Sequence, residues 1–143
     1  MTRKEGIDLA KGRIQVAFDR LKEAEDSLKA SNLRGSQHSA YYAAYTAIRV
    51  LLNLEHEEQR KHQGNIGEFR RLYIKTKILD EKLSTYIGIL SRYRDIGDYD
   101  LDYIPKWEDT ANLVENAREF VVEINGYLYD NYFKSDREQS ADS

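Results

Sequence analysis

The chain has 143 residues, of which 41% are hydrophobic and 33% charged, and this suits one domain with a core of its own. It contains no cysteine, which excludes disulfides, thiolate zinc sites, iron–sulfur clusters and cysteine nucleophiles. The net charge of −3 is unevenly placed, because residues 1–71 carry 13 basic and 10 acidic groups (+3) and residues 72–143 carry 9 and 15 (−6). With a charged N-terminal segment and no long apolar run, we expect no signal peptide, no membrane contact and a cytoplasmic location.

Two long helices are predicted first along the chain. Apolar residues recur in steps of three and four from Ala10 to Leu28, which is typical of a helix that packs in a bundle. We expect Gly35 to end this helix and Ser36 to cap the second one. The second helix has small and apolar residues on its inner face, namely Ala40 or Tyr41, Ala44, Ala47 or Ile48, and Leu51.

Three further helices are predicted after a polar loop at 53–65. A short third helix carries Ile66, Phe69 and Leu72 or Tyr73. Asp80 is a suitable N-cap for the fourth helix, and Pro105 lies in an extended segment before the fifth. The fourth helix has Leu83, Ile87, Leu90 and Arg94 at helical spacing, and the fifth has Ala111, Val114, Ala117, Val121, Ile124 and Leu128.

These elements predict an all-α fold. Helices one, two, four and five are long enough for an antiparallel four-helix up-and-down bundle, and the third is a short addition to it. We expect the bundle to occupy residues 1–133 and a polar, disordered tail to occupy 134–143.

Arg94 is the first candidate functional residue, because it continues the apolar face of the fourth helix. An inward arginine keeps its charge and needs a partner, and Asp98 lies one turn further on. In one interpretation the two side chains form a structural pair that closes the helix end. In the other, Arg94 lies in a polar cleft with Tyr99 and Arg92, where a guanidinium binds phosphate or stabilises a phosphorane-like transition state.

Three other features are candidates for binding. Segment 60–77 carries six basic residues, Arg70 and Arg71 among them, against one acidic residue, and is either a solvated helix face or a phosphate contact. Tyr41 and Tyr45 share one helical face, and Tyr42 lies on another. These tyrosines either pack in the core or form a platform on which bases stack. His62 caps the third helix or lines the cleft. The histidines lack the paired spacing of a bundle metal site, so we expect no metal and no cofactor.

Four segments in this order resemble the HEPN superfamily (higher eukaryotes and prokaryotes nucleotide-binding). They are "AYYAAYTAIRVLL" (40–52), "KHQGNIGEF" (61–69), "RDIGDYD" (94–100) and "ENAREFVVEINGYL" (115–128). More narrowly, the chain is similar to small stand-alone prokaryotic HEPN proteins with an R-x-x-x-D-Y signature. The resemblance implies an all-α bundle that forms a homodimer. It also implies a toxin–antitoxin module in which the HEPN protein is the toxin and a minimal nucleotidyltransferase its partner.

Active HEPN toxins are metal-independent ribonucleases whose signature is an arginine, four to six residues and a histidine. Here Arg92 or Arg94 can stand for the arginine, but Asp98 and Tyr99 occupy the place of the histidine. Arg94 should lower the pKa of Asp98 and so make it a poor base, whereas Tyr99 can donate a hydrogen bond. Two functions therefore stay open, an RNA-targeting toxin and a non-catalytic module that binds a nucleotide or a partner. A purely structural homodimer is a third and weaker alternative.

The resemblance and the residue chemistry together give one predicted site. Its catalytic candidates are Arg94, Asp98 and Tyr99. Its candidates for binding nucleotide or RNA are Arg92, Tyr41, His62, Arg70 and Arg71.

Overall fold

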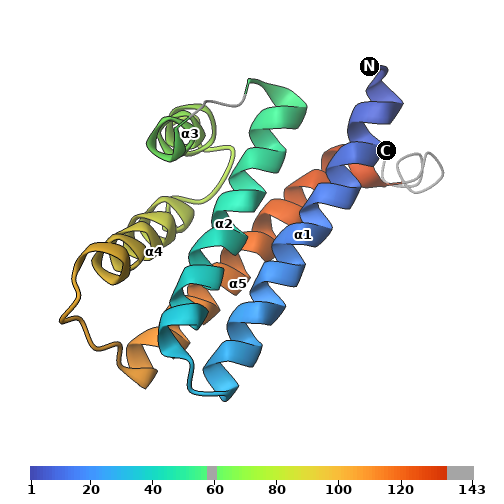
Figure 1. The fold of residues 1–143 in the computed structure, drawn as a ribbon. Helices are drawn as coiled ribbons and strands as arrows, with labels where there is room; N and C mark the ends of the chain where they lie inside the picture. Colours follow the sequence, from blue (N-terminus) through green and yellow to red (C-terminus); the bar gives the residue numbers. More distant parts are fainter. Residues whose placement is uncertain (58–60, 135–143) are drawn as a thin grey trace.

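The computed structural model describes residues 1–57 and 61–134, and all regular structure in these ranges is helical (Figure 1). This confirms the predicted all-α fold. None of the helices within these ranges combines the length and apolar character needed to cross a membrane. The predicted polar tail lies outside the described residues apart from Lys134. The elements are α1 (Arg3–Lys29), α2 (Leu33–Glu55), α3 (His62–Phe69), η1 (Arg70–Ile74), α4 (Lys82–Tyr99), α5 (Trp107–Leu128) and η2 (Tyr129–Phe133).

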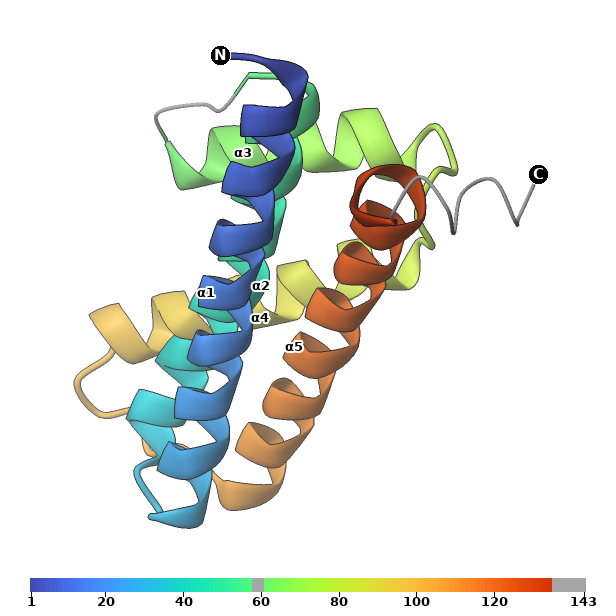
Figure 2. The ribbon, with the colours of Figure 1, turned by 90° about the vertical axis from the view of Figure 1, so that its right-hand side faces the viewer.

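Helix α2 is the centre of the bundle and packs against α1, α3, α4 and α5. Helices α1, α2 and α5 run alongside one another, with α1 antiparallel to the other two (Figures 1 and 2). Helix α4 lies across this group on the far side of α2 from α1, an arrangement that apolar spacing alone does not specify. Most of the predicted inward residues are buried, as Ala17, Leu51, Phe69, Leu83 and Val121 show with no exposed surface. Leu28 and Ala111 are only partly buried.

The turn between α1 and α2 differs from the prediction. Helix α1 ends earlier, at Lys29, and Ser31 takes a positive φ of 60°. Asn32 caps α2, because its side-chain oxygen accepts the Gly35 N–H at 3.1 Å. Ser36 is buried inside α2, where its hydroxyl donates to the carbonyl of Ala24 on α1 at 2.7 Å. The predicted stop at Gly35 and cap at Ser36 are therefore wrong, since a polar residue further upstream satisfies the first turn.

Two other boundaries were predicted more closely. The polar loop is shorter than 53–65, because α2 continues to Glu55 and α3 begins at His62. Asp80 does accept the N–H of Lys82 at 2.8 Å, although Glu81 is the residue at the helix boundary.

Helices α3 and α5 each continue into a π-helical turn, η1 and η2. Both turns meet at Glu55, the last residue of α2. The Glu55 carboxylate accepts hydrogen bonds from Tyr73 of η1 at 2.6 Å, from Tyr127 of α5 at 2.8 Å and from Tyr132 of η2. On the other side of η1, Arg70 donates to the hydroxyl of Ser84 on α4 at 3.0 Å. These contacts fix α3 and η1 against the bundle.

Candidate functional site

Arg94 reaches from α4 toward α2, as its spacing predicts. Its guanidinium carbon lies 5.2 Å from the ring centre of Tyr41 and 6.0 Å from that of Tyr42, and its side chain is 21% exposed. Carboxylate oxygens of Asp95 and Asp98 lie 3.3 and 3.2 Å from its nitrogens. The Arg94–Asp98 pair predicted from the spacing is therefore present, and it faces two aromatic rings.

The charge of Arg94 is only partly satisfied by these neighbours. Within the described chain, its Nε atom is buried and makes no hydrogen bond, although Asp98 lies within ion-pair distance. Burial alone would lower the pKa of the guanidinium, but Tyr42, Tyr41 and the two carboxylates outweigh it and raise the pKa. Arg94 thus remains a cation in a half-buried position, which is the state in which an arginine binds phosphate.

His62 is brought to the same tyrosines from the start of α3. Its Nδ1 atom lies 3.2 Å from the hydroxyl of Tyr41, and its ring stacks on Tyr45 with a centre-to-centre distance of 4.0 Å. The ring of Tyr42 stands nearly perpendicular to that of His62 at 5.8 Å. All three tyrosines therefore surround His62, including Tyr42, which the sequence placed on a different face.

The electrostatics of this cluster favour a neutral histidine. Burial lowers the pKa of His62 below its ordinary value of 6.5, and the charges of Arg94 and Arg49 lower it further. Burial raises the pKa of the Tyr41 hydroxyl far above 10.0 although Arg94 opposes this, so Tyr41 is a neutral hydrogen-bonding group. The cluster thus pairs a fixed cation with an uncharged imidazole that can accept a proton near neutral pH.

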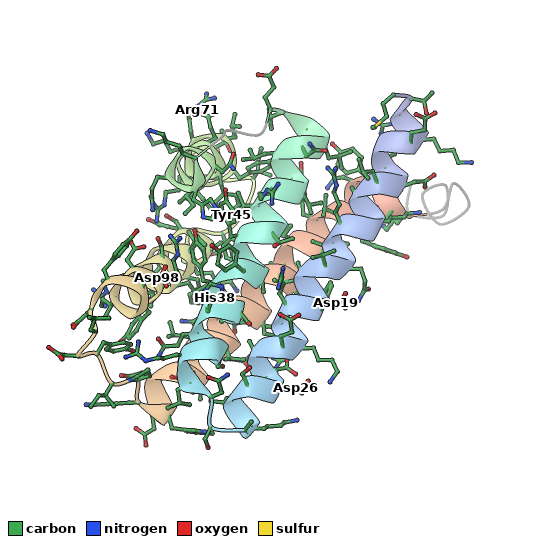
Figure 3. The ribbon with its side chains drawn as sticks, in the orientation of Figure 1. Asp19, Asp26, His38, Tyr45, Arg71 and Asp98 are labelled. Atoms are coloured by element: carbon green, nitrogen blue, oxygen red, sulfur yellow. The ribbon has the colours of Figure 1, made fainter. Side chains whose placement is uncertain are left out.

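The remaining predicted residues lie apart from this cluster. Arg70 and Arg92 line a separate hollow of about 330 Å³ that α3 and η1 form with α4. Arg71 is exposed, pairs with Glu68 at 2.6 Å and lies on the outer side of this region, away from Tyr45 and Asp98 (Figure 3). Tyr99, the last residue of α4, is 82% exposed. Of the eight predicted residues, the structure brings together Arg94, Asp98, Tyr41 and His62.

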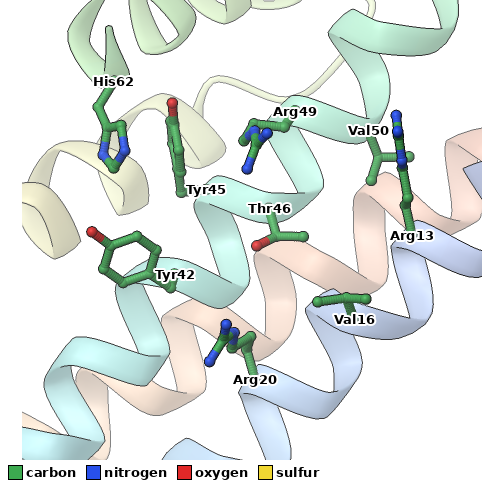
Figure 4. A pocket seen from close by; sticks show the side chains of 9 residues that line it. All are labelled: Arg13, Val16, Arg20, Tyr42, Tyr45, Thr46, Arg49, Val50 and His62. Carbon is green, nitrogen blue, oxygen red and sulfur yellow. The ribbon is translucent and has the colours of Figure 1, made fainter. Parts of the chain in front are cut away.

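Three arginines next to the cluster were not among the predicted site residues. Arg13, Arg20 and Arg49 line a hollow of about 380 Å³ between α1 and α2, together with Tyr42, Tyr45 and His62 (Figure 4). One signal for them is present in the sequence. Arg13 and Arg20 are seven residues apart and so share a face of α1, and Arg49 lies one turn after Tyr45.

No group of three or more His, Asp or Glu side chains suited to a metal ion occurs among residues 1–57 and 61–134. The polar groups of the cluster described above are those of Arg94, His62, the three tyrosines and the two carboxylates beside Arg94. Its polar groups come from α2, α3 and α4, so the site depends on how these helices pack.

The sequence that forms this helical bundle matches a known family. The model of the HEPN domain matches residues 10–127, and the chain belongs to the HEPN family, as the resemblance predicted. A protein of Methanocaldococcus jannaschii named "Putative toxin" is 31% identical over 115 residues, which cover 76% of this chain and 78% of the relative. A Thermotoga maritima protein named "UPF0332 protein" is 25% identical over 108 residues, 76% of each chain.

Proposed function

We propose that this protein is an RNA-targeting toxin of a toxin–antitoxin module, with a minimal nucleotidyltransferase as its partner. Membership of the HEPN family and the toxin name of one relative support the biological role. The observation that carries the proposal is that Arg94 and His62 both contact Tyr41. The cluster then contains an arginine and a histidine although no histidine follows Arg94 in the sequence.

These residues supply groups that metal-independent RNA cleavage requires. His62 takes the proton of a ribose 2′-hydroxyl, whose oxygen attacks the adjacent phosphate. Arg94 stabilises the negative charge that develops on the phosphate oxygens. The Tyr41 hydroxyl, which accepts from Nδ1 in one tautomer of His62, leaves Nε2 as the basic atom. The leaving 5′-oxygen takes its proton from water, and the protonated His62 then returns its proton to the solvent.

A second candidate is a non-catalytic module that binds a nucleotide or a partner. It is favoured by the two carboxylates on Arg94, because a substrate phosphate must compete with Asp95 and Asp98 for the guanidinium. In this case Arg94 and its aromatic neighbours hold a ligand without cleaving it. RNA from cells that make the protein would then stay intact.

Growth of cells induced to express the protein separates the candidates. We expect the wild type to stop growth, and Arg94→Ala and His62→Gln to permit it at matched levels of folded protein. Lys22→Ala is the matched control, because Lys22 is an exposed cation on α1 that pairs with Asp26 outside the cluster. RNA from arrested cells should carry new 2′,3′-cyclic phosphate ends. Full toxicity of Arg94→Ala would refute the proposal, and arrest without new RNA ends would favour the binding module.

A further inference from the structure

The hollow beside the cluster combines positive charge with aromatic surface. Helix α1 contributes Arg13 and Arg20, whose backbones are about 10 Å apart along the helix at 1.5 Å per residue. Arg49 comes from α2, on the opposite wall (Figure 4). The nine residues that line the hollow, all within the described chain, include three arginines and no acidic side chain. Its volume of about 380 Å³ lies in the range of sites that hold small ligands.

The positive charge in this hollow is not cancelled by the contacts of the arginines on α1. Arg13 donates to the uncharged amide of Asn53 at 2.8 Å. Arg20 pairs with Glu23 at 3.3 Å, but both side chains are about half exposed, and such surface pairs are weak and easily exchanged. Arg49 lines the same hollow, and its charge contributes to the lowered pKa of His62. An anion with several oxygens is the ligand that such guanidinium groups bind best.

The aromatic side of the hollow is built by Tyr42, Tyr45 and His62. Tyr45 is buried, and its hydroxyl accepts from the amide of Asn65 at 2.8 Å, so it is a fixed support for the stacked imidazole. Tyr42 is only half buried and stands edge-on to both Tyr45 and His62. Unpaired nucleobases stack on tyrosine and histidine rings, whereas the bases of a duplex are already stacked on one another.

We propose that this hollow binds single-stranded RNA, with phosphates on Arg13, Arg20 and Arg49 and an unpaired base against Tyr42. His62 belongs both to the lining of the hollow and to the Arg94 cluster, so an RNA strand bound in the hollow lies next to the imidazole of His62. The inference deepens the proposed function, on which it rests for the choice of RNA, by assigning a strand-binding subsite next to the cleavage groups. Arg13 and Arg20 belong to α1, which contributes nothing to the predicted HEPN signature.

Fluorescence anisotropy with a labelled, unstructured RNA of twelve nucleotides tests this subsite. Arg94→Ala protein is the background, so that the RNA is not cut during the measurement. We expect Arg20→Ala and the double variant Arg13→Ala/Arg20→Ala to weaken binding about 10-fold or more. Each lost phosphate contact should reduce the slope of log K against log salt by about 0.7. Lys22→Ala is the matched control, because Lys22 is an exposed cation on α1 paired with Asp26 outside the hollow.

Two substitutions of Tyr42 test the base contact. Tyr42→Leu should weaken binding about 5- to 100-fold through loss of stacking, whereas Tyr42→Phe should retain it. Equal RNA binding by the Arg94→Ala parent protein and by the arginine double variant in that background, or a preference for duplex over single strand, would overturn the inference.

The binding result and the growth result are independent. If the wild type does not arrest growth but binds single strands through Arg13 and Arg20, the toxin proposal fails and the subsite stands. If the wild type arrests growth and the arginine variants bind RNA and arrest growth equally well, the subsite alone is refuted.

Discussion

Replacement of Glu55 by glutamine should destabilise the protein more than its half-buried position suggests. The carboxylate accepts hydrogen bonds from three tyrosines, and the amide of glutamine retains one acceptor oxygen and adds a group that cannot accept. At least one hydroxyl therefore loses its acceptor, and Tyr73, which is 1% exposed, cannot turn to water. A hydrogen bond to a charged group contributes about 1.5–3 kcal/mol, so we expect the free energy of unfolding to fall by about 2–3 kcal/mol.

Urea and thermal unfolding followed by circular dichroism measure this loss. For a chain of this size we expect the Tm to fall by about 6–12 °C, with an unchanged dependence on urea. Tyr73→Phe should lower the free energy of unfolding by about 1.5 kcal/mol, the lower end of this range, because the carboxylate keeps its other two donors. Glu23→Gln is the control, because its exposed pair with Arg20 should contribute less than about 1 kcal/mol. A Glu55→Gln protein within about 0.5 kcal/mol of the wild type would refute the view that Glu55 clamps η1 and η2 to α2.

Two further predictions concern stability. Ser36→Ala should lower the free energy of unfolding by about 1 kcal/mol in urea titrations, because it removes the buried hydrogen bond to Ala24 that joins α2 to α1; an unchanged value would show that this bond contributes nothing. Burial, aided by the hydrogen bond to Glu55, raises the pKa of Tyr132 from 10.0 to about 12. Because the folded state holds this proton more tightly, the stabilisation is complete below pH 10 and is lost as the pH rises toward 12. The free energy of unfolding from urea titrations should therefore be lower at pH 11 than at pH 9, and this difference should be smaller for Tyr132→Phe. Equal free energies of unfolding at the two pH values would contradict this.

The faces of the helices could be predicted from the sequence because the apolar period is regular. Leu83, Ile87 and Leu90 are buried, and Arg94 follows on the same face. The hydrogen bonds at the first turn of α2 were less predictable. A serine after a glycine is a plausible cap, and only the close approach of α1 and α2 shows that the hydroxyl of Ser36 bonds across to α1 instead.

The candidate site could be predicted only in part, because its residues belong to three helices. Helical spacing shows which side chains of one helix share a face, but it does not show which faces of different helices meet. Tyr41 and Arg94 meet because α4 lies across α2, and α3 then places His62 against Tyr41. Arg13 and Arg20 were not predicted because the spacing does not show that their face of α1 lies beside Tyr42 and His62. The family signature gave no further indication, since none of its residues lies on α1.

Proton transfer depends on where catalytic groups lie in space and not on their order along the chain. The same set of catalytic groups occurs on unrelated folds in different chain orders. A histidine after Arg94 is therefore unnecessary if an imidazole reaches the same place from another helix. Under the proposed function, His62 is that group, and its lowered pKa keeps it able to accept a proton. Asp98, which lies in the position of the missing histidine, then needs no role as a base. Its carboxylate, 3.2 Å from Nε of Arg94, orients the guanidinium toward the tyrosines, so that Asp98→Asn should weaken activity less than His62→Gln does.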